Sequence, residues 1–176
     1  MPILVNAHTY LSELVAADKA ALVEHLKEKE IYDHTLRIPY PYTEADADKF
    51  LAFLAEKEKE QGHTLNWAIR DGRDALIGCC SLEDFTPGQS HRAEVGYWLA
   101  KPYWGRGIMT AVVRALCEHA RTELGLRKIT AHVFAFNRGS ARVLEKCGFE
   151  QEGYLKKHLV KDGRLVDVRL YGLIQG

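Results

Sequence analysis

Apolar side chains recur every three or four residues in four stretches of the chain, which is the spacing of an amphipathic helix. The spacing predicts helices over 17–29, 44–61, 108–124 and 138–147. Thr43 and Asn137 are residue types that cap a helix start, and a glycine follows each of the last three stretches. The segment 36–42 contains two prolines, so we expect it to form an extended loop.

Alternation of apolar and polar residues predicts strands in the remaining stretches, at 8–14, 64–70, 74–82, 92–99, 128–136, 149–159 and 165–173. Asp-Gly pairs at 71–72 and 162–163 are typical of tight hairpin turns. The order is therefore strand, two helices, three strands, helix, strand, helix and two strands. This order predicts a single α/β domain over 1–176 with a mixed sheet.

Two of the predicted helices have a clear inner face. In the helix over 44–61, we expect four large residues to face the core: Phe50, Leu51, Phe53 and Leu54. In the helix over 108–124, the apolar stripe consists of Met109, Val112, Val113, Leu116, Ala120 and Leu124. Both helices should therefore pack against the sheet.

Composition narrows the function classes. The 176 residues contain 24 Lys and Arg against 24 Asp and Glu, so the net charge is zero and nothing indicates nucleic-acid binding. We expect no membrane span, because no run of 18 apolar residues occurs. The four cysteines, Cys79, Cys80, Cys117 and Cys147, lack metal-site or disulfide spacing. They indicate reduced, mostly buried thiols in a cytoplasmic protein without a metal.

The most informative segment is the loop over 104–110, where Gly105 and Gly107 connect a predicted strand to a helix. The first turn of that helix has no acidic residue, so its free N–H groups and positive dipole end favour a phosphate or pyrophosphate. A Walker loop is excluded because no Lys-Ser/Thr pair follows Gly107. A dinucleotide fingerprint is excluded because Thr110 stands where its third glycine belongs. The local pattern alone also suits a plain strand-to-helix turn.

A second motif, Asn137 to Phe149 with sequence NRGSARVLEKCGF, lies one predicted strand downstream of this loop. With the Tyr103-Trp104-Gly105-Arg106-Gly107 loop, it resembles the GNAT superfamily of acyl-CoA N-acyltransferases. Within that superfamily, the chain is similar to the RimJ/RimL branch, the N-terminal acetyltransferases of ribosomal proteins. The resemblance is dense over 75–173 and looser before it.

The resemblance implies a fold and a cosubstrate. The fold is a mixed, mostly antiparallel sheet, flanked by helices, whose two central strands splay apart to admit the pantetheine of acetyl-CoA. Main-chain groups of Trp98 and Leu99 would bond the pantetheine, and Asn137 would contribute beside it. The pyrophosphate would bind the loop made of Trp104, Gly105, Arg106, Gly107, Ile108, Met109 and Thr110. Met109 departs from the glycine or alanine of many members, but its N–H can still donate.

Ser140 is the candidate that protonates or stabilises the leaving thiolate, because an Asn137 cap places it third in the helix, in the positive field of the helix start. The alternative is that Ser140 only supports the cap. Many GNAT enzymes use a tyrosine four residues later, but Leu144 excludes that here. The RimJ/RimL branch has serine at the Ser140 position.

Glu94 is the candidate base, because family members often place a glutamate there that acts through water; the alternative is a structural salt link. Leu159 stands where some RimL-like enzymes have a glutamate. His91 and His132 are lone histidines, which are more often structural than catalytic. A free α-amine with a pKa near ~8 needs little help to lose its proton, so a strong base is not required.

The acceptor is the least determined part. Tyr40 and Tyr42 belong to the proline-stiffened loop, which would line the acceptor entrance, whereas the aromatics at 97, 98, 103 and 104 suit packing. We expect a protein N-terminal α-amine. A small amine (polyamine, amino-acid analogue or aminoglycoside) and a non-catalytic CoA-binding module stay open as alternatives. A homodimer and a longer acyl group also stay open.

Overall fold

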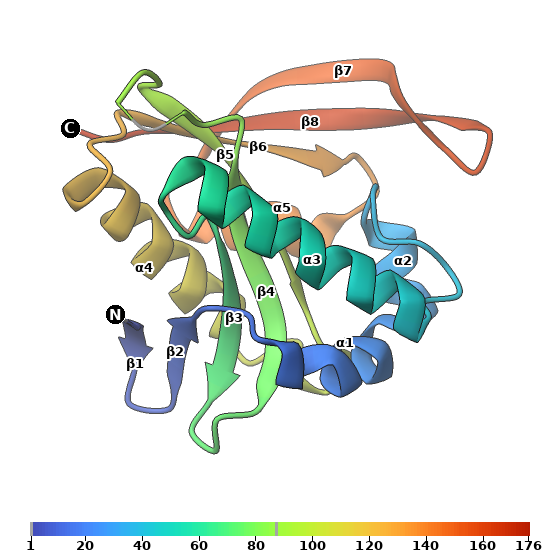
Figure 1. Ribbon diagram of the computed structural model, residues 1–176. Helices are drawn as coiled ribbons and strands as arrows, with labels where there is room; N and C mark the ends of the chain where they lie inside the picture. The colour runs from blue at the N-terminus through green and yellow to red at the C-terminus, as the bar shows by residue number, and fades with distance from the viewer. Residues whose placement is uncertain (1, 87) are drawn as a thin grey trace.

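The computed structural model describes residues 2–86 and 88–176. Their eight strands form one sheet in the order β1-β2-β3-β4-β5-β6-β8-β7. In Figure 1, α3 crosses in front of β4, α1 and α2 lie at the right, and the long β7–β8 hairpin runs across the top. This mixed sheet flanked by helices confirms the predicted fold class.

The strands are β1 (Ile3–Asn6), β2 (Thr9–Ser12), β3 (Asn66–Asp71), β4 (Leu76–Glu83), β5 (Arg92–Leu99), β6 (Lys128–Phe134), β7 (Glu150–Lys161) and β8 (Arg164–Ile174). All neighbours pair antiparallel except β5 and β6, which are parallel. A parallel pair needs a crossover, and α4 provides it. The hairpin turns predicted at 71–72 and 162–163 follow β3 and β7.

The helices are α1 (Lys19–Leu26), α2 (Lys29–His34), α3 (Glu44–Gln61), α4 (Ile108–Thr122) and α5 (Arg138–Lys146), with short 3-10 turns at Ala16–Asp18 and Lys101–Tyr103. One face of the sheet packs on α4 and α5 through a core that includes Val112, Leu116 and Leu144, all fully buried. The other face packs on α1, α2 and α3 through Leu22, Leu26 and Ile31. Burying each of these side chains contributes about 1.5–3 kcal/mol.

The N-terminal part differs from the sequence prediction in two places. A single strand over 8–14 was expected, but β1 and β2 form a hairpin whose turn is held by the His8 N–H donating to Asn6 Oδ1 at 2.8 Å. The helix expected over 17–29 is broken. Glu28 is extended, with a ψ of 116°, and begins α2. The turn at Glu28 brings both Leu26 and Ile31 into the same core, which one straight helix would not do.

The helix α3 confirms its predicted start and end but not all of its inner face. Thr43 and Asp46 form a capping box, and Gly62 ends the helix with a φ of 69°. Phe50 and Leu51 pack against the core, but Phe53 is 52% exposed, so its predicted inward orientation is wrong. Ala47 takes the central buried position on that face, and Phe53 lies off that stripe.

A gap opens between β5 and β6 and is the feature of the fold that matters most for function. The two strands pair only at Arg92–Lys128, Ala93–Ile129 and Glu94–Thr130. Beyond Glu94, β5 stays paired to β4 through Leu99, and β6 stays paired to β8 through Phe134. The central strands therefore diverge, and main-chain groups on their facing edges have no strand partner.

Candidate functional site

The start of α4 is open. Gly107 is the N-cap in a left-handed conformation (φ 75°), no side chain caps the helix, and its first turn holds no acidic residue. The first N–H of this region to bond inside the protein is that of Ala111, which donates to the Gly107 carbonyl at 3.1 Å. Within residues 2–86 and 88–176, the N–H groups of Ile108, Met109 and Thr110 have no protein acceptor. Unpaired N–H groups at a helix start form an anion site.

The two glycines leave space for that anion. Gly105 has a φ of 73°, and a Cβ built on Gly105 or Gly107 would meet no heavy atom within 4 Å. The space over the loop is thus free, and a side chain there would project into it. Trp104 is 38% exposed and donates its indole N–H to the Leu99 carbonyl at 2.6 Å, so it fastens the loop to the end of β5. Arg106 is exposed beside Tyr103.

The register of β5 determines which main-chain groups face the gap. Ala100 donates its N–H to Ile77 on β4 at 2.8 Å, and hydrogen-bonded pairs alternate along an antiparallel ladder. The main-chain groups of Trp98 are therefore directed toward its β4 partner Cys79. Those of Tyr97 and Leu99 point toward the gap. The main-chain hydrogen bonds to pantetheine that the resemblance implies for Trp98 and Leu99 therefore suit Leu99 but not Trp98. Tyr97 takes the place of Trp98.

The start of α5 lies on the α4 side of the gap. Asn137 caps it, accepting the Ser140 N–H on its Oδ1 at 3.1 Å, as predicted. Ser140 is the third residue of the helix and is half-buried. Its Oγ lies 2.8 Å from the hydroxyl of Tyr97, a contact between β5 and α5 that the sequence did not predict. Burial raises the pKa of the Tyr97 phenol, so that hydroxyl stays protonated and can donate to Ser140.

The opposite face of the sheet carries the charged groups nearest the gap. Glu94 alternates with Gly96 and Trp98 and faces the α1–α3 side. Its Oε1 lies 2.9 Å from Nδ1 of His132, which follows the last β5–β6 pair by two residues. On β4, Glu83 is the cross-strand partner of Glu94 and pairs with Arg37 at 2.6 Å. The carboxylates of Glu83 and Glu94 and the His132 ring therefore lie on one side of the gap. Ser140 lies on the other side.

The loop that precedes α3 contains both predicted acceptor-side tyrosines, and only one of them is accessible. Tyr40 is 45% exposed and packs on Tyr32, with ring centroids 5.1 Å apart. Tyr42 is only 7% exposed and belongs to the core beneath α1 and α3, where burial raises its pKa to about 12. The prediction that Tyr42 lines the entrance is therefore wrong. The apolar contacts it makes with that core hold it inward.

The tip of the β7–β8 hairpin closes over α2 beside this loop. Lys161 places its Nζ 3.4 Å from the centre of the Tyr32 ring and donates to the Thr35 carbonyl at 2.8 Å. Tyr32 also hydrogen-bonds to Asp162. These contacts connect two segments far apart in the sequence, α2 and the tip of the β7–β8 hairpin.

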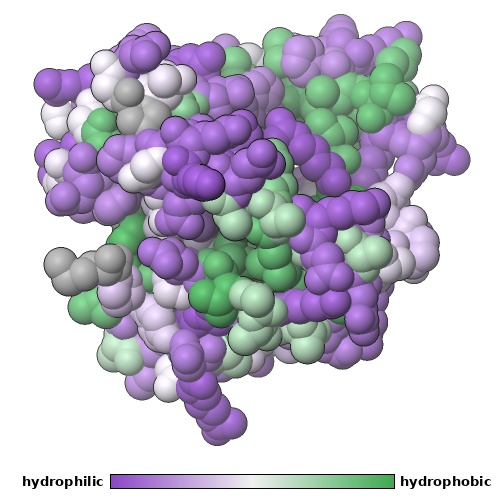
Figure 2. Space-filling view, in the orientation of Figure 1, coloured by the Kyte–Doolittle hydropathy of each residue, from purple (hydrophilic) through white to green (hydrophobic). Residues whose placement is uncertain are grey.

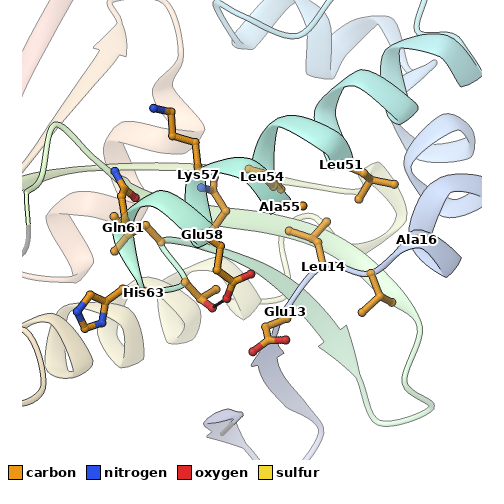
Figure 3. Close-up of a pocket in the computed structure, with 14 residues that line it drawn as sticks. Glu13, Leu14, Ala16, Leu51, Leu54, Ala55, Lys57, Glu58, Gln61 and His63 are labelled. Atoms are coloured by element: carbon orange, nitrogen blue, oxygen red, sulfur yellow. Dashed lines mark hydrogen bonds between the residues drawn. The ribbon is translucent and has the colours of Figure 1, made fainter.

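Two cavities lie outside this gap, one apart from the predicted site and one beside its glycine loop. One of about 320 Å³ lies between the C-terminal half of α3 and the chain after β2, lined by residues that include Leu14, Leu51 and His63 (Figure 3). It shares no residue with the predicted site. Figure 2 shows hydrophobic residues exposed below α3 and over the β7–β8 hairpin on an otherwise hydrophilic face. A second cavity of about 650 Å³ reaches the glycine loop at Arg106 and Ile108.

Across 2–86 and 88–176, no three His, Cys, Asp or Glu side chains gather as a metal site would require. In that part of the chain no helix combines the length and apolar character needed to cross a bilayer. The cysteines are free, and three of the four are buried, as predicted. Burial raises the pKa of Cys117 to about 12, which leaves its thiol unreactive.

Comparison with known proteins gives a family for this site. A family model described as "Acetyltransferase (GNAT) domain" matches residues 8–150. Probable N-acetyltransferase YjcK of Bacillus subtilis is 41% identical over 101 residues, which cover 57% of this chain and 56% of YjcK. The match therefore spans just over half of that relative. Spermidine N(1)-acetyltransferase of Vibrio cholerae is 28% identical over 77% of this chain and 76% of its own length.

Solved structures agree with the fold. RimL, a ribosomal L7/L12 α-N-protein acetyltransferase solved in complex with coenzyme A, aligns with a TM-score of 0.89 at 21% identity. The alignment covers 99% of this chain and 98% of that one. The family match over most of the chain and the shared fold agree with the glycine loop and the splayed strands. The chain belongs to the GNAT acetyltransferase family.

Proposed function

We propose that this protein is an acetyl-CoA-dependent N-acetyltransferase and that its acceptor is the α-amine of a protein N-terminus. The gap between β5 and β6 is the observation that carries the proposal. On one side of the gap lie the open start of α4 and Ser140, and on the other lie Glu94 and the acceptor loop. An amine and a thioester that approach from opposite sides of the sheet would meet inside the gap.

The donor fits the open side of the site. The N–H groups of Ile108, Met109 and Thr110 would hold the pyrophosphate of acetyl-CoA, and Gly105 and Gly107 leave room for it. The edge of β5 that faces the gap offers main-chain groups of Tyr97 and Leu99 to the pantetheine, as a strand partner would. This side therefore has both an anion site and an unpaired strand edge.

The chemistry needs one proton removed from the amine and one delivered to the sulfur. A neutral amine nitrogen forms the new C–N bond at the thioester carbonyl carbon, and the C–S bond breaks. The Leu99 N–H is placed to donate to the oxygen as negative charge develops there. The Ser140 hydroxyl donates a proton to the leaving sulfur and recovers one from the nitrogen through solvent. Tyr97 orients Ser140 through the 2.8 Å hydrogen bond between their hydroxyls.

Several observations support an N-terminal α-amine. Such an amine has a pKa near ~8, so part of it is neutral at pH 7, unlike a lysine side chain near ~10.4. An extended chain end could hydrogen-bond along the open gap, beside the exposed Tyr40. RimL, which shares the fold, is named for an α-amine of a ribosomal protein.

We also place the protein in the cytoplasm, since its four cysteines are free.

A small polyamine is the second candidate acceptor. Glu83 and Glu94 are cross-strand neighbours on the acceptor face, and adjacent carboxylates attract polycations. A relative is named for spermidine acetylation. Against this reading, Arg37 and His132 already pair with these two carboxylates. The positive charge of Arg37 offsets the charge of Glu83, so less negative charge is left for a polycation than two free carboxylates would provide.

The test is a kinetic panel with acetyl-CoA. It compares peptides with a free N-terminus, the same peptides N-blocked but carrying lysine, spermidine, and an aminoglycoside. The proposal expects the highest kcat/KM for a free N-terminus. A spermidine kcat/KM far above every peptide would replace the acceptor. Binding of acetyl-CoA without turnover of any amine would leave only a CoA-binding module.

A further inference from the structure

We propose that His132 is the catalytic base and that Glu94 is the positioning residue that holds its ring. The inference rests on the proposed function and deepens it, because it assigns the step that neutralises the acceptor amine. It also changes the role that the sequence suggested for Glu94.

The geometry fixes which nitrogen of the ring is available. Nδ1 of His132 lies 2.9 Å from Oε1 of Glu94, and a carboxylate oxygen can only accept there. Nδ1 therefore carries the hydrogen, and the neutral ring keeps a lone pair on Nε2. Among the residues the structure describes, the one polar contact of the ring is that of Nδ1 with Glu94, and Nε2 makes none. The side chain of His132 is 32% exposed, so an acceptor amine or a bridging water can reach it.

The position of the ring also suits a base. Thr130 is the last β6 residue paired with β5, so His132 stands on the part of β6 that has already left β5. On β6 it alternates with Thr130 and Phe134, which places it on the acceptor side of the sheet. Ser140 is on the other side. The base and the group that meets the leaving sulfur then face the reacting carbonyl from opposite sides.

Within residues 2–86 and 88–176, Glu94 is the only direct ionic partner of the His132 ring. His158 on β7 lies parallel to it, with an interplanar angle of 7° and centroids 6.0 Å apart. On β8 the residue opposite is the apolar Leu170.

More distant charges are already paired. On β4, Glu83 is the cross-strand partner of Glu94 and is paired with Arg37. Further along β6, Lys128 is paired with Glu152 of β7.

An imidazole matches the acceptor better than a carboxylate does. Free imidazole has a pKa near ~6.5 and a free glutamate near ~4.3, against ~8 for an α-amine. A base works best when its pKa is close to the working pH and to the pKa of the group that it deprotonates. In the step, an N–H bond of the ammonium breaks and its proton moves to Nε2. The electron pair stays on the nitrogen, and the proton then leaves to solvent.

The kinetic arm uses the full-length protein with acetyl-CoA and tetra-alanine amide carrying a free N-terminus. We expect His132→Asn to lower kcat/KM for the peptide by about 100-fold. It should also leave only the rise in kcat/KM with pH that the acceptor amine causes as it loses its proton near ~8, with the affinity for acetyl-CoA unchanged. Glu94→Gln should lower kcat/KM less and keep a rise with pH. Added imidazole should restore part of the activity to His132→Gly.

Two controls separate a catalytic from a structural role. His63→Asn changes an exposed histidine away from the gap and should leave kcat/KM unchanged. A thermal melt of each variant should show that it folds. Nitrogen NMR of the histidine rings in the wild type, which needs no acceptor, should show His132 with hydrogen on Nδ1 and a bare Nε2.

The outcomes distinguish this inference from the proposed function. If the wild type acetylates the peptide while His132→Asn keeps its rate and pH profile, the base assignment is overturned and the function stands. An Nε2–H tautomer, or loss of the pH dependence in His158→Asn alone, would also overturn it. If the wild type acetylates no amine at all, the proposed function fails and the base assignment fails with it.

Discussion

Two helix starts in this protein have opposite designs. At α3, the Thr43 hydroxyl accepts the Asp46 N–H and the Asp46 carboxylate accepts the Thr43 N–H, so the protein satisfies its own donors. At α4, Gly107 offers no side chain, and the donors of Ile108 to Thr110 stay open. A capped start stabilises the fold, and an open start leaves its donors for a ligand. The uncapped start of α4 is therefore where the proposed acetyl-CoA site has its free donors.

The largest effect is expected when a negative charge is placed at the open start. Gly107→Asp should weaken acetyl-CoA binding at least about 1,000-fold, because its carboxylate would lie beside the pyrophosphate. Calorimetric titration measures the change. The matched control is Gly62→Asp at the end of α3, where the glycine has a similar φ of 69° and equally open space. It should carry the same backbone strain yet bind normally. Equal losses in both variants would contradict the site.

Substitution of Ser140 tests whether the capped start of α5 also takes part in the reaction. Ser140→Ala should lower kcat by about 10- to 1,000-fold with little change in acetyl-CoA affinity, because the proton donor to the sulfur is lost. Single-turnover kinetics measures the chemical step directly. Ser140→Thr keeps a hydroxyl and should retain more activity than the alanine variant. An alanine variant with wild-type kcat would leave Ser140 a role in the cap alone.

Tyr97 sharpens that test, since its hydroxyl lies 2.8 Å from the Ser140 hydroxyl. Tyr97→Phe removes one hydrogen bond and keeps the packing of the ring, so kcat should fall about 3- to 10-fold. The double variant with Ser140→Ala should be no slower than Ser140→Ala alone, because both act through one hydroxyl. Additive losses would show that the two residues act independently.

The capped start of α3 should respond in the opposite way. Thr43→Ala should lower the free energy of unfolding by about 1 kcal/mol, measured by urea denaturation, because the Asp46 N–H loses the Thr43 hydroxyl as an acceptor. The affinity for acetyl-CoA should not change. If Thr43→Ala weakened acetyl-CoA binding without loss of stability, the start of α3 would not have the purely stabilising role described here.

The smallest effect concerns the pH dependence of that cap. Hydrogen bonds from the Thr43 side chain and main chain lower the pKa of the Asp46 carboxyl. A lowered folded pKa stabilises the fold above the unfolded value near ~3.9, and this stability is lost as the pH falls through the folded pKa. Asp46→Asn should therefore be less stable than wild type at neutral pH, and the difference should vanish in acid. A difference independent of pH would exclude this linkage.

The parts of the molecule that the sequence could predict depend on neighbours along the chain. The capping box at Thr43, the Asn137 cap and the glycine loop follow from short-range rules, and the structure has all three. The break at Glu28 was missed because it serves a core contact, the joint burial of Leu26 and Ile31. Local spacing favoured one continuous helix there.

The parts that could not be predicted depend on register between distant strands. The Glu94–His132 and Tyr97–Ser140 contacts join residues 38 and 43 positions apart, and neither spacing nor composition fixes such pairs. The direction of the Trp98 and Leu99 main-chain groups follows from β4 pairing in the same way. Tyr42 was misplaced because the path of the proline loop turns it into the core.

The most direct test of the account follows individual backbone amides during a titration with coenzyme A by nitrogen–proton NMR. The account predicts large shifts for the amides of Gly107, Ile108, Met109 and Thr110 as the pyrophosphate accepts their hydrogens. The amides of Glu44 to Asp46, at the capped start of α3, should stay in place. Saturable binding that leaves the α4 amides unmoved, or that shifts the start of α3 instead, would contradict the central claim.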